Sequence, residues 1–91
     1  MSERVISEVE FTEKFTNEFD CVCNEIIFTA VNGNKLLLTL FDTKPLNADN
    51  LDNSYYGAAE ETLSGLPDGF PTIYSIMYTE EAAQKCGIQP S

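Results

Sequence analysis

The sequence predicts a single α+β domain, with a small antiparallel sheet of three to four strands packed against two or three short helices. Three observations predict this class. Two strand-like runs flank an Asn-Gly-Asn turn in residues 25–41, apolar residues recur at helical spacing in other segments, and residues 72–79 are rich in branched and aromatic side chains. The 91 residues, 43% of them hydrophobic, suffice for one modest core, so residues 1–91 are expected to form one compact domain.

The N-terminal region carries two overlapping patterns. Alternating apolar residues from Val5 to Phe11 predict a short strand. Apolar residues at spacings of four, four and three then predict an amphipathic helix over residues 11–20. Because such a stripe usually faces the protein's own core, we expect it to pack inward rather than into a partner's groove. The stripe consists of Phe11, Phe15, Phe19 and Val22.

Residues 25–41 predict a central β-hairpin around Asn32-Gly33-Asn34. A two-residue loop of Asn32 and Gly33 has favoured turn chemistry, but it divides the apolar side chains between both faces. A three-residue loop with Asn34 in the left-handed region gathers most of them on one face. Because one buried Leu or Phe side chain contributes about 1.5–3 kcal/mol, the second register is preferred. Its inward residues are Ile26, Phe28, Ala30, Leu36, Leu38 and Leu40.

Polar and turn-forming residues follow the hairpin and predict a loop over residues 42–53. Asn53 or Ser54 is expected to cap a helix that runs to Leu63, because Tyr55, Ala59 and Leu63 recur every four residues. Ser64 and Gly65 then end the run before Pro67.

The last two elements are a strand and a helix. Branched and aromatic residues predict the strand at residues 72–79, in an edge or a central position. Thr79 is expected to cap a short helix over residues 80–86, which has two acidic residues in its first turn and Gly87 at its stop position.

The cysteines do not predict a disulfide framework or a metal site. Cys21, Cys23 and Cys86 are an odd number, and we expect all three to be reduced. A zinc site needs four ligands, and the chain has no histidine. A calcium loop that began at Asp49 would place Leu51 at a ligand position. We therefore predict neither metal nor cofactor.

Catalysis and membrane insertion are also not expected. The absence of histidine removes the commonest general base and the usual activator of a nucleophile, and the five glycines are too scattered for a phosphate-binding loop. No stretch approaches the roughly 20 apolar residues that span a bilayer, and the N-terminus lacks a signal-like run. We expect a cytoplasmic protein that is not an enzyme.

Charge is the strongest functional signal. The chain has 15 acidic and 5 basic residues, and residues 45–84 contain no Lys or Arg. Such a field repels nucleic acid and anionic lipid and attracts basic surfaces, so the expected partner is a protein with a basic surface, for example a nucleic-acid-binding enzyme. The predicted partner-binding residues are Asp49, Asp52, Tyr55, Tyr56, Glu60, Glu61, Glu80 and Glu81.

In size and acidity, the chain resembles the small nucleic-acid mimics that phages and mobile elements direct against host CRISPR or restriction nucleases. The resemblance implies an inhibitor of the anti-CRISPR or anti-restriction type, which occupies a basic nucleic-acid channel. The alternative is a structural or assembly protein that oligomerises through an apolar sheet face and is acidic for solubility. Either a monomer or a homodimer is compatible with these expectations.

Overall fold

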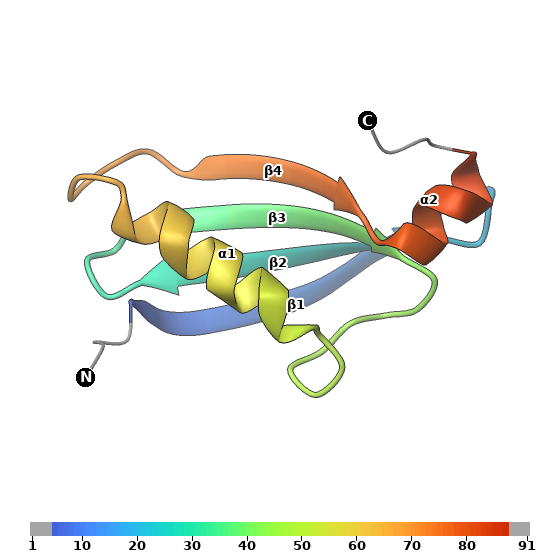
Figure 1. Cartoon of the computed structure of the whole chain (residues 1–91), viewed down its shortest axis with the longest axis horizontal. Coiled ribbons are helices and arrows are strands. Elements are labelled where there is room, and N and C mark those ends of the chain that lie inside the picture. The colour runs from blue at the N-terminus through green and yellow to red at the C-terminus, as the bar shows by residue number, and fades with distance from the viewer. Residues whose placement is uncertain (1–4, 88–91) are drawn as a thin grey trace.

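The computed structural model describes residues 5–87, without the side chains of residues 13 and 14. In chain order its elements are β1 (Ile6–Thr16), β2 (Val22–Ala30), β3 (Lys35–Asp42), α1 (Asn53–Ser64), β4 (Ile73–Tyr78) and α2 (Glu80–Cys86). The strands form one sheet in the order β1-β2-β3-β4, with α1 across one face and α2 beside one end (Figure 1). The α+β class is therefore confirmed.

The sheet is mixed, so the prediction of a purely antiparallel sheet is wrong at its fourth strand. β1, β2 and β3 pair antiparallel, whereas β4 pairs parallel to β3. Parallel neighbours cannot be joined by a tight turn. Here the chain leaves β3, returns along the sheet through α1, and enters β4 in the same direction as β3 (Figure 1).

The helix predicted over residues 11–20 is wrong, because these residues form the second half of β1 and the turn after it. Phe11 pairs with Ile26, but Phe15 pairs with Cys23 on the opposite face, since the pairing register shifts between Glu13 and Phe15. Apolar residues four apart fit either a helix or one face of a regular strand. Because of the bulge, Phe11 and Phe15 lie on opposite faces of β1 and do not form a continuous apolar row.

The hairpin has the predicted facing of its apolar residues, because Phe28 pairs with Leu36 and Ile26 with Leu38. A hydrogen bond from the Ala30 N–H to the Asn34 carbonyl, 2.7 Å long, closes a three-residue loop. The left-handed position belongs to Gly33, with φ of 91°, and not to Asn34 as predicted. Glycine adopts this conformation without the steric penalty that a Cβ atom causes.

The core lies between α1 and the sheet face that α1 covers, which we call the inner face. Ile26, Phe28 and Leu40 are fully buried there, and Leu63 of α1 is 1% exposed. The ring of Tyr56 meets that of Phe28 edge to face, with centroids 5.7 Å apart. Burial of these apolar groups is the main stabilising contribution to the fold.

The caps of the two helices differ in how well the sequence predicted them. Asp52 caps α1 by accepting a hydrogen bond from the Ser54 N–H, one residue before the predicted positions. Thr79 caps α2 as predicted, and Gly87 ends that helix with φ of 71°. Both caps satisfy backbone N–H groups that have no partner within the helix.

Two buried asparagines fix the connections on either side of α1. Asn24 of β2 accepts a hydrogen bond from the Leu46 N–H and donates to the Lys44 carbonyl. Asn34 donates to the Pro67 carbonyl over 2.7 Å and accepts from the Phe70 N–H over 3.0 Å. These bonds hold the segments that enter and leave α1 against the sheet, and thereby position β4.

Candidate interaction surface

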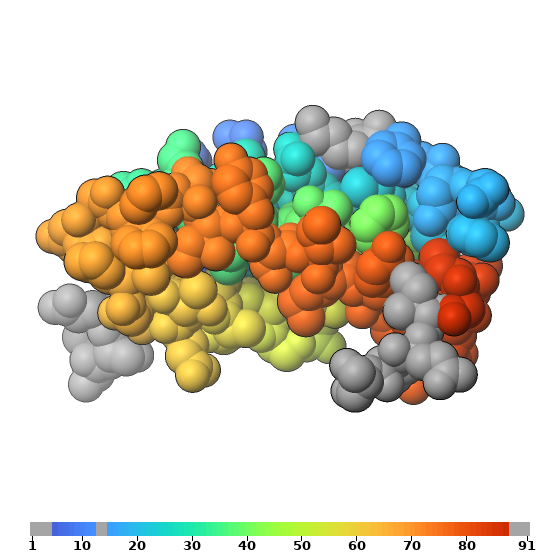
Figure 2. Space-filling view, turned by 90° about the horizontal axis from the view of Figure 1, so that it is seen from above, coloured from blue at the N-terminus to red at the C-terminus, as the bar shows by residue number. Residues whose placement is uncertain are grey.

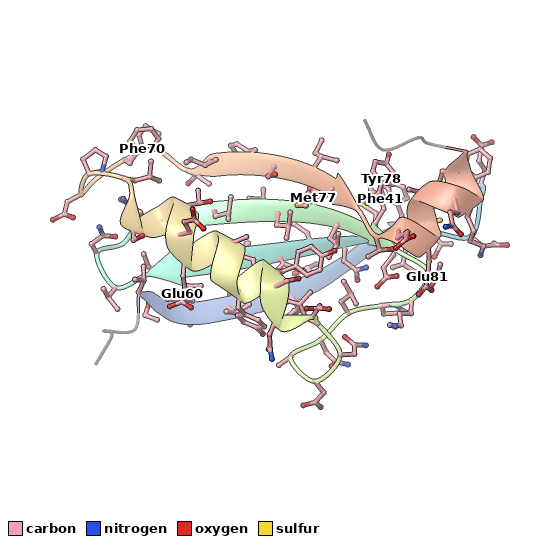
Figure 3. All side chains as sticks on the ribbon, viewed as in Figure 1. Phe41, Glu60, Phe70, Met77, Tyr78 and Glu81 are labelled. Atoms are coloured by element: carbon pink, nitrogen blue, oxygen red, sulfur yellow. The ribbon has the colours of Figure 1, made fainter. Side chains whose placement is uncertain are left out.

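The eight residues predicted to bind a partner lie in two groups. Asp49, Asp52 and Tyr55 lie at or before the start of α1, and Glu80 and Glu81 begin α2. These two helix starts are close together, since Asp52, Tyr55 and Thr79 line one recess of 260 Å³. The second group is Tyr56, Glu60 and Glu61 of α1. Glu60 and Glu81 lie toward opposite ends of the molecule (Figure 3).

The two predicted tyrosine anchors are partly used by the fold. Tyr55 and Tyr56 are both half-buried and pack against the core. Burial raises the pKa of Tyr55, and the nearby carboxylates of Asp42 and Asp52 raise it further. These tyrosines therefore offer a partner less free surface than their position in the sequence indicated.

Two further recesses lie beside α1. One of 360 Å³ lies between β1 and α1, with Val9, Tyr56 and Glu60 in its lining, and an apolar one of 220 Å³ lies between α1 and β4. Within the described part of the chain, no group of three or more His, Cys, Asp or Glu side chains could hold a metal ion.

Among the side chains that the structure describes, Asp42 is the one carboxylate that is both buried and part of a recess lining. Its Oδ1 accepts hydrogen bonds from the Thr43 N–H over 2.7 Å and from the Thr79 hydroxyl over 3.1 Å. Thr79 is also the cap of α2. Asp42 therefore joins the end of β3 to the start of α2, which is a structural role.

The sheet face opposite α1, which we call the open face, has no described helix over it. Figure 2 shows the atoms of α1 on one side of the sheet and no described helix on the other. Cross-strand pairing arranges the side chains of this face in rows. From β4 to β1, the first row is Tyr74, Leu37, Ile27 and Glu10, the second is Ile76, Thr39, Glu25 and Thr12, and the third is Tyr78, Phe41, Cys23 and Phe15.

The β3–β4 half of the open face is apolar and exposed. Tyr74 is 72% exposed and Ile76 69% exposed. Tyr78 stacks on Phe41 with ring centroids 4.6 Å apart and planes 11° from parallel (Figure 3). Among the described residues, eight large apolar side chains are exposed, and three of these belong to β4 and lie on the open face, namely Tyr74, Ile76 and Tyr78. We call Leu37, Phe41, Tyr74, Ile76 and Tyr78 the apolar stripe.

The β1–β2 half of the same face carries its carboxylates, together with Phe15, which is 55% exposed at one end. Glu8 and Glu10 of β1 are exposed, and Glu25 of β2 is half-buried. Glu8 and Glu10 pair with Thr29 and Ile27, which places them on the open face with Glu25. We call these three carboxylates the acidic border. Lys35, at the start of β3, is the one described basic residue whose pairing places it on this face.

β4 is also an edge of the sheet. Among the described residues, only β3 pairs with it, and Figure 2 shows its side chains along the near surface. No charged residue lies between Asp68 and Glu80, so the strand carries no charge of its own. Edge strands of this kind are usually protected by Lys, Pro or a bulge, because their free N–H and C=O groups can pair with another chain.

Comparison of the chain with models of protein families, with curated proteins and with solved structures finds no match. No helix among the described residues is both long enough and apolar enough to cross a membrane.

From the sequence, an apolar sheet face was expected only in the alternative, the assembly protein, and residues of β4 were not predicted to form an exposed one. The signal was present in residues 72–79, where Tyr74, Ile76 and Tyr78 alternate with Ser75 and Met77. Alternation shows that these three side chains share one face, but it does not show whether that face is covered. That information depends on α1, which covers only the inner face.

Proposed function

We propose that the protein is a binding protein without catalytic activity, and that its open face docks on a protein surface that combines an apolar ridge with basic side chains. The observation that carries the proposal is the exposure of Tyr74 and Ile76, at 72% and 69%, on a face with no described helix over it. Contiguous exposed apolar surface on a small soluble domain is typical of a protein interaction site.

The two halves of the open face have complementary tasks in this proposal. The apolar stripe provides aromatic and aliphatic side chains that lose water on contact and supply affinity. Within the acidic border, Glu8 and Glu10 lie about 14 Å from β4, three strand spacings away, and Glu25 lies about 10 Å from it, two spacings away. An amphipathic helix is about 10–12 Å across, so one laid on the face can reach the apolar stripe while its basic side chains reach the border.

The net charge of −10 favours a basic partner over a second copy of the chain at long range. Nucleic acid is disfavoured, because its phosphates meet the acidic border and only Lys35 is a described cation on this face. The target class we propose is a nucleic-acid-binding enzyme, with a host defence nuclease as the leading example. Carboxylates would then occupy a surface that normally attracts phosphates.

Fluorescence anisotropy with a defined probe tests the proposal. The probe is a labelled amphipathic helical peptide with a leucine face and a lysine flank, and its scrambled sequence is the comparison. Wild type should bind the ordered peptide more tightly than the scrambled one, and more tightly at low salt than at high salt.

Variants locate the binding surface. Replacement of Tyr74 and Ile76 by Ser should weaken binding about tenfold or more. Val31→Ser is the matched control, since Val31 in the hairpin turn is also 69% exposed, and it should leave affinity unchanged.

Replacement of Glu60, Glu61, Glu80 and Glu81 by Gln should cause a smaller, salt-dependent loss of affinity. If that fourfold variant lost all binding while the Tyr74/Ile76 variant kept it, the partner would bind at the two helices instead.

The uncharged edge of β4 favours a second candidate, assembly of two copies through antiparallel pairing of their β4 strands. In a two-fold arrangement, Ile76 can lie opposite Ile76 of the second copy, and Tyr74 opposite Tyr78. The acidic borders would then lie at the two far edges, which keeps their repulsion small. Sedimentation velocity at low and high salt separates the candidates, because a dimer that persists at both and is lost on Ile76→Lys supports assembly.

A further inference from the structure

Two cysteine thiols from distant parts of the chain lie together at the α2 end of the molecule. The Sγ atoms of Cys21 and Cys86 are 3.6 Å apart, although the residues are 65 positions apart in the sequence. Cys21 precedes β2 and is fully buried, while Cys86 is the last residue of α2 and is half-buried. Both thiols are free in this structure.

The local structure holds the two sulfur atoms in place. The side chain of Asn17 accepts hydrogen bonds from the N–H groups of Phe19 and Cys21, at 2.9 and 3.0 Å, and so fixes the turn that carries Cys21. The amide of Asn17 also donates to Cys86 Sγ over 3.9 Å. The Cys21 thiol lies 3.9 Å from the Ala82 carbonyl of α2. The same turn therefore orients both thiols.

We propose that Cys21 and Cys86 form a reversible disulfide when the protein meets a small-molecule disulfide such as oxidised glutathione, and that this bond fastens α2 to the β1–β2 turn. A disulfide bond is about 2.0 Å long, so the sulfur atoms must approach by about 1.5 Å. α2 has only seven residues, and Ala82 and Ala83 are its buried side chains, so a small shift of the helix can provide this approach.

The reaction balances as two successive exchanges. The more accessible Cys86, as a thiolate, attacks one sulfur of oxidised glutathione, forms a mixed disulfide and releases one glutathione thiolate. Cys21 then loses its proton to solvent and attacks Cys86 Sγ, which releases the second glutathione. The protein loses two electrons and two protons, and the glutathione disulfide is reduced to two thiols.

The second step should depend on pH. Burial raises the pKa of the Cys21 thiol, and its hydrogen bond with Cys86 raises it further. Because the thiolate is the attacking species, formation of the bond should become faster as the pH rises through the alkaline range.

The disulfide would stabilise the fold and would also fix the position of α2 beside the open face. It closes a long loop, which lowers the entropy of the unfolded chain. It also anchors α2, which starts two residues after Tyr78 of the apolar stripe. We expect the melting temperature to rise by about 10 °C or more on oxidation and to return on addition of dithiothreitol.

Mass spectrometry of the full chain tests the proposal. After incubation with excess oxidised glutathione at mildly alkaline pH, the intact mass should fall by two hydrogen atoms, and digestion should give a peptide pair joined through Cys21 and Cys86. Cys23→Ser should behave as wild type. Cys86→Ser, at a half-buried position, should fold and should show neither the mass loss nor the gain in melting temperature.

Three results would overturn the proposal. These are a bridge between Cys21 and Cys23, a stable adduct with one glutathione that never closes, and an unchanged mass under conditions that oxidise a free dithiol peptide.

Discussion

The two faces of the sheet are built from alternate residues of the same strands, yet the inner face is covered by α1 and the open face has no described helix over it. On the inner face, Leu38 is 4% exposed beneath α1, while on the open face, Ile76 is 69% exposed. Hydrophobic burial alone does not explain why a marginally stable domain keeps an exposed apolar stripe. The inner face therefore holds the core of the fold, and in our proposal the open face is available to a partner.

The largest expected effect is on the free energy of unfolding, and it is tested by replacing one residue from each face. Phe28→Ala should lower the free energy of unfolding by about 3–5 kcal/mol, because it leaves a cavity beneath α1. Ile76→Ala should change it by less than about 0.5 kcal/mol, because the side chain is mostly in water. Urea denaturation measures both. Similar losses for the two variants would show that the open face is covered by something in solution.

The same comparison can be made for polar side chains, between the stability lost at a buried asparagine and at an exposed one. Asn34→Ala should cost about 1–3 kcal/mol, because it leaves the Pro67 carbonyl and the Phe70 N–H without the partner they have now. Asn32→Ala is the comparison, since Asn32 is exposed although its side chain also accepts from the Asn34 N–H. Chemical denaturation should rank Asn34 well above Asn32, and the reverse order would remove the role assigned to Asn34.

A smaller effect is expected from pH at the start of α1. The hydrogen bond from the Ser54 backbone N–H lowers the pKa of Asp52 from its ordinary value of 3.8. Because the folded value is the lower one, the stability that the charged cap adds is complete above the ordinary value and is lost as the pH falls through the folded value. Asp52→Asn keeps a capping side chain without the charge.

Urea midpoints of wild type and Asp52→Asn should therefore differ at neutral pH, with wild type higher, and should converge in acid. A difference that persisted unchanged in acid would mean that the charge of Asp52 does not contribute.

The smallest expected effect comes from salt. With a net charge of −10, mutual repulsion opposes the folded state, so added NaCl should raise the melting temperature by a few degrees. Glu8→Gln with Glu10→Gln should reduce that slope, because both carboxylates belong to the acidic border. A melting temperature independent of salt would indicate that the charges are too dispersed to repel one another.

Local patterns in the sequence predicted the elements whose signals are local. The Thr79 cap, Gly87 and the acidic first turn of α2 are all within one short segment, and the hairpin follows from its turn and from the alternation on both sides. The first half of β1 was predicted as a strand, but its second half was assigned to a helix, because Phe11 and Phe15 fit a helical spacing and the bulge between them cannot be recognised from residue identity. The parallel direction of β4 depends on the path that the chain takes through α1, and the periodicity of apolar residues does not show that path.

The same limit applies to the candidate surface. The acidic residues can be counted in the sequence, but the sequence does not show which of them share a face. Strand pairing places Glu10 and Glu25 on the same face as Ile76. Glu60 and Glu81 belong to different helices and lie toward opposite ends of the molecule (Figure 3). Asn34 was predicted only as a turn residue and Asn24 was given no role, because a buried asparagine and an exposed one are identical in sequence.

The most direct test of the central claim is side-chain footprinting of the four tyrosines by hydroxyl radicals, with and without the lysine-flanked amphipathic peptide. Tyr74 and Tyr78 belong to the apolar stripe, and Tyr55 and Tyr56 belong to α1. Our account predicts that the peptide protects Tyr74 and Tyr78 and leaves Tyr55 and Tyr56 as reactive as before. Protection of Tyr55 and Tyr56, with Tyr74 and Tyr78 unchanged, would contradict it.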